Sequence, residues 1–88
     1  MIWLAEVRVM LKPSVNDPQG LSIKSALRTL GFDGVEDVRA GKLIQVRLDA
    51  ADREAAQAAA HAMCDKLLAN PVIETYEVTL SEVSAPVP

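Results

Sequence analysis

The sequence has few of the residues on which enzymes and nucleic-acid-binding proteins usually depend. Its 88 residues include one Cys, one His and three aromatic residues, which are Trp3, Phe32 and Tyr76. The single Cys excludes an internal disulfide. Lys and Arg number 9 against 12 for Asp and Glu, the net charge is −3, and no basic run is present. This balance disfavours binding to nucleic acid, whose phosphates require basic patches.

Long apolar runs are also missing. No stretch approaches the roughly 20 residues that a membrane-spanning helix needs. The N-terminal segment 1–4 leads directly into Glu6 and Arg8, which is not the pattern of a secretory signal. We therefore expect a cytoplasmic protein with neither a membrane nor a nucleic acid as its partner.

Half of the residues are hydrophobic, and much of this share is Ala and Val. A chain of 88 residues is expected to form one domain. Such a domain buries only roughly 60–65% of the surface that it exposes when unfolded, and association with other copies is a common way to stabilise it. We therefore expect a homo-oligomer with little room to enclose a substrate.

Alternation of apolar and polar residues predicts β-strands. Four strands are predicted, at 3–12, 35–39, 43–48 and 72–83. Pro13 ends the first of them, because proline cannot donate to the ladder. Gly41 can turn the chain or place a bulge in it, so the segment 35–48 is either a hairpin or one long bent strand.

Two helices are predicted from their end signals. Asp17-Pro18 is a strong helix start, and it gives a first helix over about 18–30. The Ala-rich run 55–69 gives the second, and Asn70-Pro71 ends it.

The predicted order is β-α-β-β-α-β. This order matches a ferredoxin-like α+β fold, in which two helices cover one face of an antiparallel sheet. Residues 1–83 are expected to form this domain, and residues 84–88 are expected to form a disordered C-terminal tail.

A search for reactive groups predicts no catalytic, cofactor-binding or metal-binding residue. His61 and Cys64 could supply two metal ligands, or a base and a nucleophile. Zinc needs three or four ligands, however, and nothing nearby would activate the thiol. Asp33, Glu36 and Asp37 could serve a metal or acid–base chemistry, although solvated turn charges are the simpler interpretation. No glycine-rich phosphate-binding motif is present.

Three residues are candidates for contacts with a partner chain. Arg39 and Lys42 are long cations beside Gly41, and the sequence gives neither of them a local acidic neighbour. They either contact a partner, bind a small anion or remain solvated surface charges. Trp3 either lies at a subunit contact, where Trp is enriched, or covers the edge of the domain's own core.

Three stretches, in order along the chain, carry a family resemblance. They are Lys12-Pro13 with Asp17-Pro18-Gln19-Gly20, then Asp37-Val38-Arg39-x-Gly41-Lys42, and then Met63-Cys64-x-Lys66-Leu67-Leu68-Ala69-Asn70-Pro71-Val72-Ile73-Glu74-x-Tyr76. Jointly they are specific, and they resemble the PurS family, the small subunit of phosphoribosylformylglycinamidine synthase. The resemblance spans about residues 1–83.

The resemblance implies a function that spacing alone does not indicate. Members associate with a glutaminase subunit and a large synthetase subunit, which uses ATP and Mg²⁺. The assembly converts formylglycinamide ribonucleotide, glutamine and ATP into formylglycinamidine ribonucleotide in purine biosynthesis. The small subunit is expected to carry no catalytic residue and no cofactor. It is expected to bridge the other two subunits, to help ammonia pass between them, and to form homodimers or tetramers.

Two other functions remain open from the residues. Ferredoxin-like domains often dimerise and bind effectors, so a stand-alone small-molecule-binding or regulatory dimer is an alternative based on fold analogy. A small cysteine or metal enzyme built around His61 and Cys64 is the other alternative.

Overall fold

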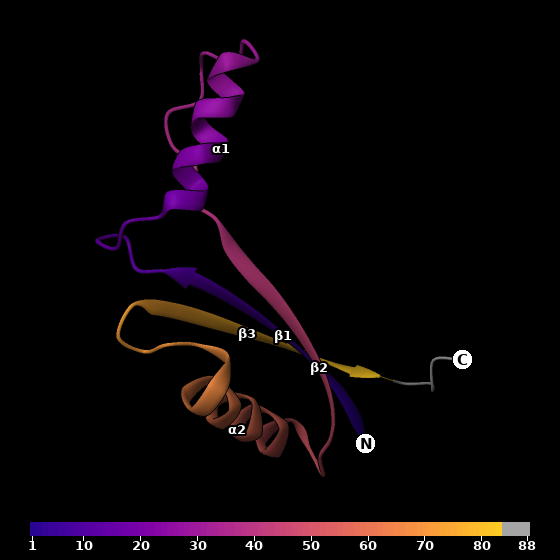
Figure 1. Cartoon of the computed structure of the whole chain (residues 1–88). Coiled ribbons are helices and arrows are strands. Elements are labelled where there is room, and N and C mark those ends of the chain that lie inside the picture. The colour runs from indigo at the N-terminus through magenta and orange to yellow at the C-terminus, as the bar shows by residue number, and fades with distance from the viewer. Residues whose placement is uncertain (84–88) are drawn as a thin grey trace.

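A three-stranded antiparallel sheet forms the centre of the computed structural model, which describes residues 1–83 (Figure 1). The predicted disordered tail, 84–88, lies outside the described residues. The elements in chain order are β1 (Ile2–Leu11), α1 (Pro18–Thr29), β2 (Gly41–Asp49), α2 (Arg53–Met63), a π-helical turn η1 (Cys64–Leu68) and β3 (Glu74–Val83). β1 is the central strand and runs antiparallel to both β2 and β3.

The core lies on the face of the sheet that α2 covers. Alternate residues of β1 point to this face, and Ala5, Val7 and Val9 are buried there. α2 packs on β1 and β3. The buried side chains of α2 and η1 are small, and they are Ala56, Ala60 and Cys64. The helix therefore lies close to the sheet, and the core contains few large side chains.

α1 begins and ends where the sequence predicts. The Asp17 carboxylate accepts a hydrogen bond from the Gly20 N–H (2.9 Å), and a proline occupies the first turn. Gly31 follows the C-terminal cap with φ of 100°, a left-handed conformation that favours glycine. Beyond its first turn, however, α1 projects past the end of the sheet and does not pack on it (Figure 1).

The predicted ferredoxin-like α+β class is confirmed, since an antiparallel sheet with two helices is present, although the observed order is β-α-β-α-β with one strand fewer than predicted. One part of the expectation is corrected: only α2 covers the sheet face, and α1 does not join it there. Hydrogen bonds at the start of α1 hold the helix in its direction away from the sheet.

Residues 35–39 form no strand, so the predicted fourth strand is wrong, and the segment before β2 is neither a hairpin nor one bent strand. Side chains of α1 and of the segment itself bind its backbone instead. The Arg28 guanidinium donates to the Val35 carbonyl oxygen from Nε (3.1 Å) and Nη2 (3.0 Å). The Val38 N–H donates to the Asp37 carboxylate (2.9 Å). The chain therefore returns alongside α1 before it enters β2.

The predicted second helix, 55–69, is present, but its last turn is π-helical. The Ala69 N–H donates to the Cys64 carbonyl oxygen (3.0 Å), five residues earlier. The Val72 N–H then donates to the Asn70 side chain (3.0 Å) in a turn. β3 therefore begins slightly later than predicted.

Gly20, in the first turn of α1, is buried and has no room for a side chain. A Cβ there would overlap the Val38 carbonyl oxygen and the Asp17 carboxylate. We expect Gly20→Ala to lower the free energy of unfolding by about 1–3 kcal/mol, because the backbone must shift. Gly34→Ala is the matched control, since no atom lies within 4 Å of its Cβ, and it should be neutral or slightly stabilising. Urea unfolding at one fixed chain concentration compares them, and equal stabilities would contradict this close contact.

Candidate interaction site

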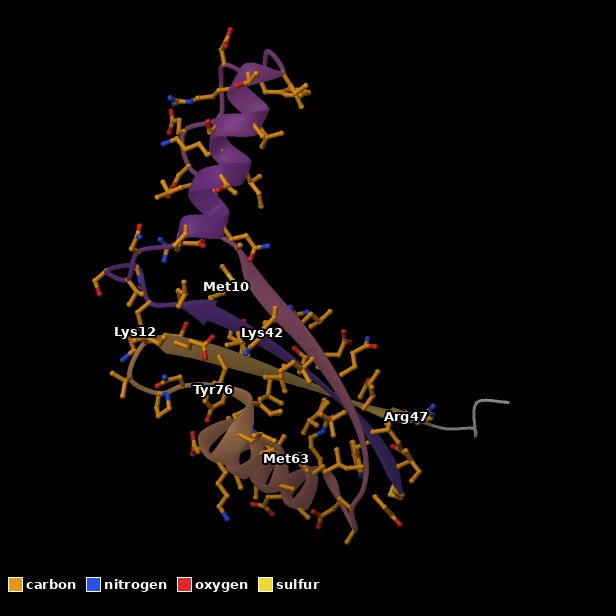
Figure 2. The ribbon with its side chains drawn as sticks, viewed as in Figure 1. Met10, Lys12, Lys42, Arg47, Met63 and Tyr76 are labelled. Carbon is orange, nitrogen blue, oxygen red and sulfur yellow. The ribbon has the colours of Figure 1, made fainter. Side chains whose placement is uncertain are left out.

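Residues from all three motif stretches meet at one end of the sheet. At this end β1 stops, α1 starts, and β2 and β3 begin. We call this junction the neck, and define it as residues 12–20, 38–42 and 70–74. Figure 2 shows Lys12 and Lys42 at this end of the sheet and Arg47 toward the other end.

Asp17 joins the two chain segments of the neck. Its side chain is almost fully buried, and Oδ1 accepts from the Gly20 N–H at 2.9 Å. Oδ2 accepts from the Ala40 N–H at 2.7 Å, just before β2. These two backbone bonds, with the nearby Arg39 guanidinium, hold the pKa of Asp17 below its ordinary value, although burial opposes the shift. One ionised carboxylate therefore ties the start of α1 to the start of β2.

Arg39 binds the loop that joins β1 to α1 in the neck. Its Nη2 donates to the carbonyl oxygens of Lys12 (3.0 Å) and Val15 (3.2 Å), and the side chain is half-buried. Arg39 therefore has a role within its own chain that the sequence did not indicate. Sequence reasoning missed this role because the two acceptors are backbone oxygens 27 and 24 residues away. The guanidinium closes the loop between β1 and α1.

Lys42 has an acidic partner that the sequence did not indicate. Its Nζ lies 3.9 Å from Glu74 Oε2. In the sheet register Lys42 faces Val9 and Glu74 faces Leu11, so the two charges lie on the same face across β1. About half of the Lys42 side chain is exposed at 54%. An exposed pair at this distance is weak, so the ammonium group remains available to another chain.

A cavity of about 230 Å³ opens in the neck, and carboxylates and an ammonium group line it together. Its charged lining residues are Asp17, Lys42 and Glu74. Two carboxylates beside one lysine would repel an anion. The geometry therefore disfavours the small-anion interpretation of Arg39 and Lys42.

Trp3 lies at the other end of β1, inside the chain's own core. Its side chain is only 5% exposed, and the Arg53 guanidinium carbon lies 5.3 Å from the ring centroid. This is a cation–π geometry between β1 and the start of α2. The placement favours covering of the core edge over a subunit contact, because little of the ring remains exposed.

His61 and Cys64 are not arranged as a reactive pair. His61 Nδ1 lies 3.2 Å from the Tyr76 hydroxyl, which donates to Asp65 Oδ1 (3.0 Å). Cys64 is fully buried, and burial, with Asp65 nearby, raises the pKa of its thiol. A raised pKa leaves less thiolate at neutral pH, which weakens a nucleophile. The cluster therefore binds η1 to β3.

Among residues 1–83, no group of three His, Cys, Asp or Glu side chains could hold a metal ion. Within the same range, no helix combines the length and the apolarity that crossing a membrane requires.

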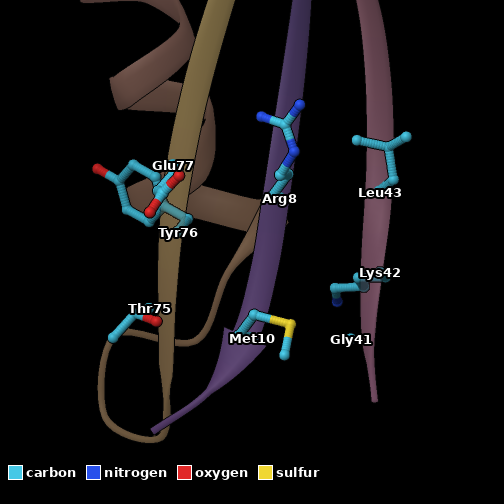
Figure 3. A pocket seen from close by; sticks show the side chains of 8 residues that line it. All are labelled: Arg8, Met10, Gly41, Lys42, Leu43, Thr75, Tyr76 and Glu77. Carbon is cyan, nitrogen blue, oxygen red and sulfur yellow. The ribbon is translucent and has the colours of Figure 1, made fainter. Parts of the chain in front are cut away.

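The face of the sheet opposite α2 carries a second cavity, of about 390 Å³ (Figure 3). Side chains from all three strands line it, and they include Arg8, Met10, Leu43, Thr75 and Glu77. Arg8 Nη1 also donates to the Thr79 hydroxyl at 3.0 Å. No helix of the described chain packs on this mixed face, so it is a second surface on which a larger protein can lie. In the sequence, this face was indicated only by the strand residues that alternate with the core-facing ones.

Comparison with known proteins gives a consistent result. The chain matches the family described as PurS, phosphoribosylformylglycinamidine (FGAM) synthase, over residues 4–82. It is 49% identical to the FGAM synthase subunit PurS of Synechocystis sp. over 78 residues, which are 86% of this chain and 78% of that protein. It is 40% identical to the same subunit of Bacillus subtilis, covering 96% of this chain and 99% of that protein.

Solved structures agree with the fold. The crystal structure of PurS from Methanocaldococcus jannaschii superposes with a TM-score of 0.84 at 36% identity, and it covers 93% of this chain and 99% of that chain. That protein is described as one of the subunits of formylglycinamide ribonucleotide amidotransferase in the purine biosynthetic pathway. A chain in the structure of PurLQS from Thermotoga maritima gives a TM-score of 0.85 at 32% identity, covering 92% of this chain and 99% of that one.

The hydrogen bonds of Arg39 predict a stability effect that Lys42 should not share. Arg39→Ala removes the donor to two loop carbonyls, and we expect it to lower the free energy of unfolding by about 1–2 kcal/mol. Lys42→Ala loses only an exposed pair and should change it by less than about 1 kcal/mol. Chemical denaturation at one chain concentration measures both. An Arg39→Ala variant as stable as Lys42→Ala would show that the guanidinium does not hold the loop.

The lowered pKa of Asp17 predicts an acid-sensitive neck. A carboxylate whose folded pKa is depressed stabilises the fold above its unfolded pKa and loses this effect as pH falls through the folded pKa. Asp17→Asn cannot accept both bonds and should unfold at a lower temperature at neutral pH. The difference from wild type should shrink as the pH falls below 3.8, the ordinary Asp value.

Thermal scans across this pH range test the Asp17 expectation. Asp33→Asn, at an exposed turn position, is the control and should unfold like wild type at neutral pH. A gap between Asp17→Asn and wild type that stays constant down to the lowest pH would contradict the ionised, doubly bonded carboxylate.

Proposed function

Because the chain belongs to the PurS family, as the match over residues 4–82 and the relatives at 49% and 40% identity establish, we propose that it is the small subunit of an FGAM synthase. Its role in this enzyme is assembly. It bridges a glutaminase subunit and a large synthetase subunit, and it aids the passage of ammonia between them. The enzyme makes FGAM from formylglycinamide ribonucleotide, glutamine and ATP in the cytoplasm. ATP and Mg²⁺ belong to the synthetase subunit.

One observation carries this proposal: the motif residues determine the shape of the chain instead of lining a reactive cleft. Asp17 and Arg39 bind backbone groups of the neck. Cys64 is sealed in the core with a raised pKa. Residues with such roles suit a subunit that positions other subunits, which carry out the catalysis.

The surfaces of the chain also fit an assembly role. Its described part extends over 50 × 33 × 17 Å, which is elongated for a chain of this length. The uncovered sheet face and α1 lie on different sides of the neck (Figure 1). One chain can therefore contact more than one partner, including a second copy of itself. Lys42, exposed at the neck, is the charged residue that we assign to such contacts.

Reconstitution from purified subunits tests the proposal. Formation of FGAM is measured with glutamine and, in parallel, with ammonia as the nitrogen source. We expect the isolated chain to have neither activity and glutamine-dependent turnover to require all three subunits. Ammonia-dependent turnover should depend less on this chain. Full glutamine-dependent turnover by the two large subunits alone would overturn the proposal.

The sealed thiol gives a specific expectation within that assay. Cys64→Ala should leave glutamine-dependent turnover within a few-fold of wild type, because a buried thiol with a raised pKa is not a working nucleophile. Circular dichroism checks that the variant is folded. Loss of all turnover in a folded Cys64→Ala variant would return Cys64 to the list of catalytic candidates.

A further inference from the structure

β3 forms one edge of the sheet and lacks the features that usually protect such an edge. The strand order is β2-β1-β3, so β3 has a neighbouring strand on one side only (Figure 1). It pairs with β1 over ten consecutive residues without a bulge. Its sequence, Glu74–Val83, contains no Pro, Lys or Arg, with which proteins commonly blunt a sheet edge. An edge of this kind is a template for a further strand.

A hydrogen bond just before β3 shows which of its backbone groups point outward. The Lys12 N–H donates to the Ile73 carbonyl oxygen (2.8 Å), so these two residues form a hydrogen-bonded pair of the antiparallel ladder. Hydrogen-bonded pairs alternate along two antiparallel strands. In the register of β1 and β3, the odd-numbered residues of β3 therefore bond to β1. The even-numbered residues direct their N–H and C=O groups away from β1, and their free amides are those of Tyr76, Val78, Leu80 and Glu82.

These outward groups have few partners within the chain. Among residues 1–83, none of the four outward amides donates to a loop or to a side chain. The Leu80 carbonyl oxygen accepts a long bond from Arg53 Nη1 (3.4 Å), which agrees with its outward direction. α2 packs on the core face of β3 and leaves this row of amides without acceptors. A further strand could supply them.

The side chains beside this edge indicate which strand would fit. On the core face, Val78 and Leu80 are half-buried, so apolar side chains of an added strand would continue the core beside them. On the opposite face, Glu77 is exposed. The charged residues of β3 are all glutamates, namely Glu74, Glu77 and Glu82. A strand that alternates apolar and basic residues is therefore complementary to this edge.

A second copy of the chain does not suit this edge. Two β3 strands paired about a two-fold axis would bring three glutamates from each strand into one ribbon, and neighbouring like charges are unfavourable there. β2 carries Lys42 and Arg47, but a head-to-tail contact between β2 and β3 does not close with two copies and would continue to further chains. The glutamates thus act against self-association and still accept a basic strand.

We propose that β3 binds an extended segment of a larger subunit of the synthase, which joins the sheet as a fourth strand. Apolar side chains of this segment lie beside Val78 and Leu80, and a Lys or Arg side chain lies opposite Glu77. Backbone hydrogen bonds to the outward groups of β3 supply the affinity, and the side chains supply the specificity.

This inference deepens the assembly role by assigning it a surface, so it rests on the proposed function in part. The two can fail separately. Reconstituted turnover tests whether the chain is needed by the synthase, whereas the backbone amides of β3 report whether a strand lies beside them.

Residue-resolved hydrogen exchange tests the added strand without any substitution. In the isolated chain, the four outward amides of β3 should exchange fast, and the inward amides of Glu77, Thr79 and Ser81 should exchange slowly. In the assembled synthase this alternation should disappear, because the outward amides become as slow as the inward ones. Outward amides that stay fast in an assembly with normal glutamine-dependent turnover would overturn the proposal and leave the assembly role intact.

β2 provides a comparison within the same experiment. The Ala50 N–H donates to the Met1 carbonyl oxygen (2.9 Å), so the same alternation directs the amides of Leu43, Gln45 and Arg47 outward from β2. Protection gained on assembly by these amides and not by those of β3 would place the added strand at the other edge and refute the proposal. Protection of the outward β3 amides that rises with the concentration of the isolated chain would show a second copy there, with the same consequence.

Charge-neutralising substitutions test the basic character of the segment. Glu77→Gln combined with Glu82→Gln should raise the Kd for the purified larger subunits several-fold at low salt, and the difference from wild type should shrink at high salt, which screens exposed charges. Asp33→Asn combined with Glu36→Gln is the matched control, since both residues are exposed in the segment that follows α1. It should bind like wild type. Equal Kd values for the two double variants would rule out a basic segment beside β3.

Discussion

The double hydrogen bond of the Asp17 carboxylate is the constraint on which the rest of the structure depends. One oxygen caps α1 at the Gly20 N–H, and the other holds the Ala40 N–H just before β2. The two ends of the segment that contains α1 and connects β1 to β2 therefore meet at a single buried side chain. Because Arg39 also holds the loop before α1, the helix has a fixed direction away from the sheet. The exposure of the large apolar side chains of α1 and its C-terminal cap, among them Ile23 and Leu30, is a consequence of this direction.

The size of the chain explains why such an arrangement is useful for an assembly protein. A domain of 88 residues can bury only a modest core, and here that core consists largely of Val and Ala side chains from β1 and α2. Apolar surface that a larger domain would bury internally remains on α1 and β2. The chain therefore gains stability by association, and its fold and its partners are linked through the same surfaces. Function in a multi-subunit enzyme follows more naturally from this design than function as an isolated catalyst.

Local signals in the sequence predicted most of the elements, whereas contacts between distant segments determined where the prediction failed. The Asp17-Pro18 start of α1 and the alternation of β1 depend on neighbouring residues, and both are correct. The segment 35–39 has strand-like residues, but Arg28 occupies its backbone oxygen at Val35. The partners of Arg39 and Lys42 lie 24 to 32 positions away, and no local pattern in the sequence contains contacts of that kind. The contacts that Arg39 and Lys42 make within the chain therefore could not be predicted from the sequence.

This difference bears on how a family signature without a reactive group can still specify function. In an active site, a distinctive residue acts on a substrate, and its role can be read from its chemistry. At the neck, Asp17 and Arg39 act on backbone atoms of their own chain, where they hold the direction of a helix. In an assembly, that direction decides which surfaces of neighbouring subunits can meet at the same time. A residue of the neck thus affects function through the geometry of the chain, because its polar groups bind atoms of the same chain and not a substrate.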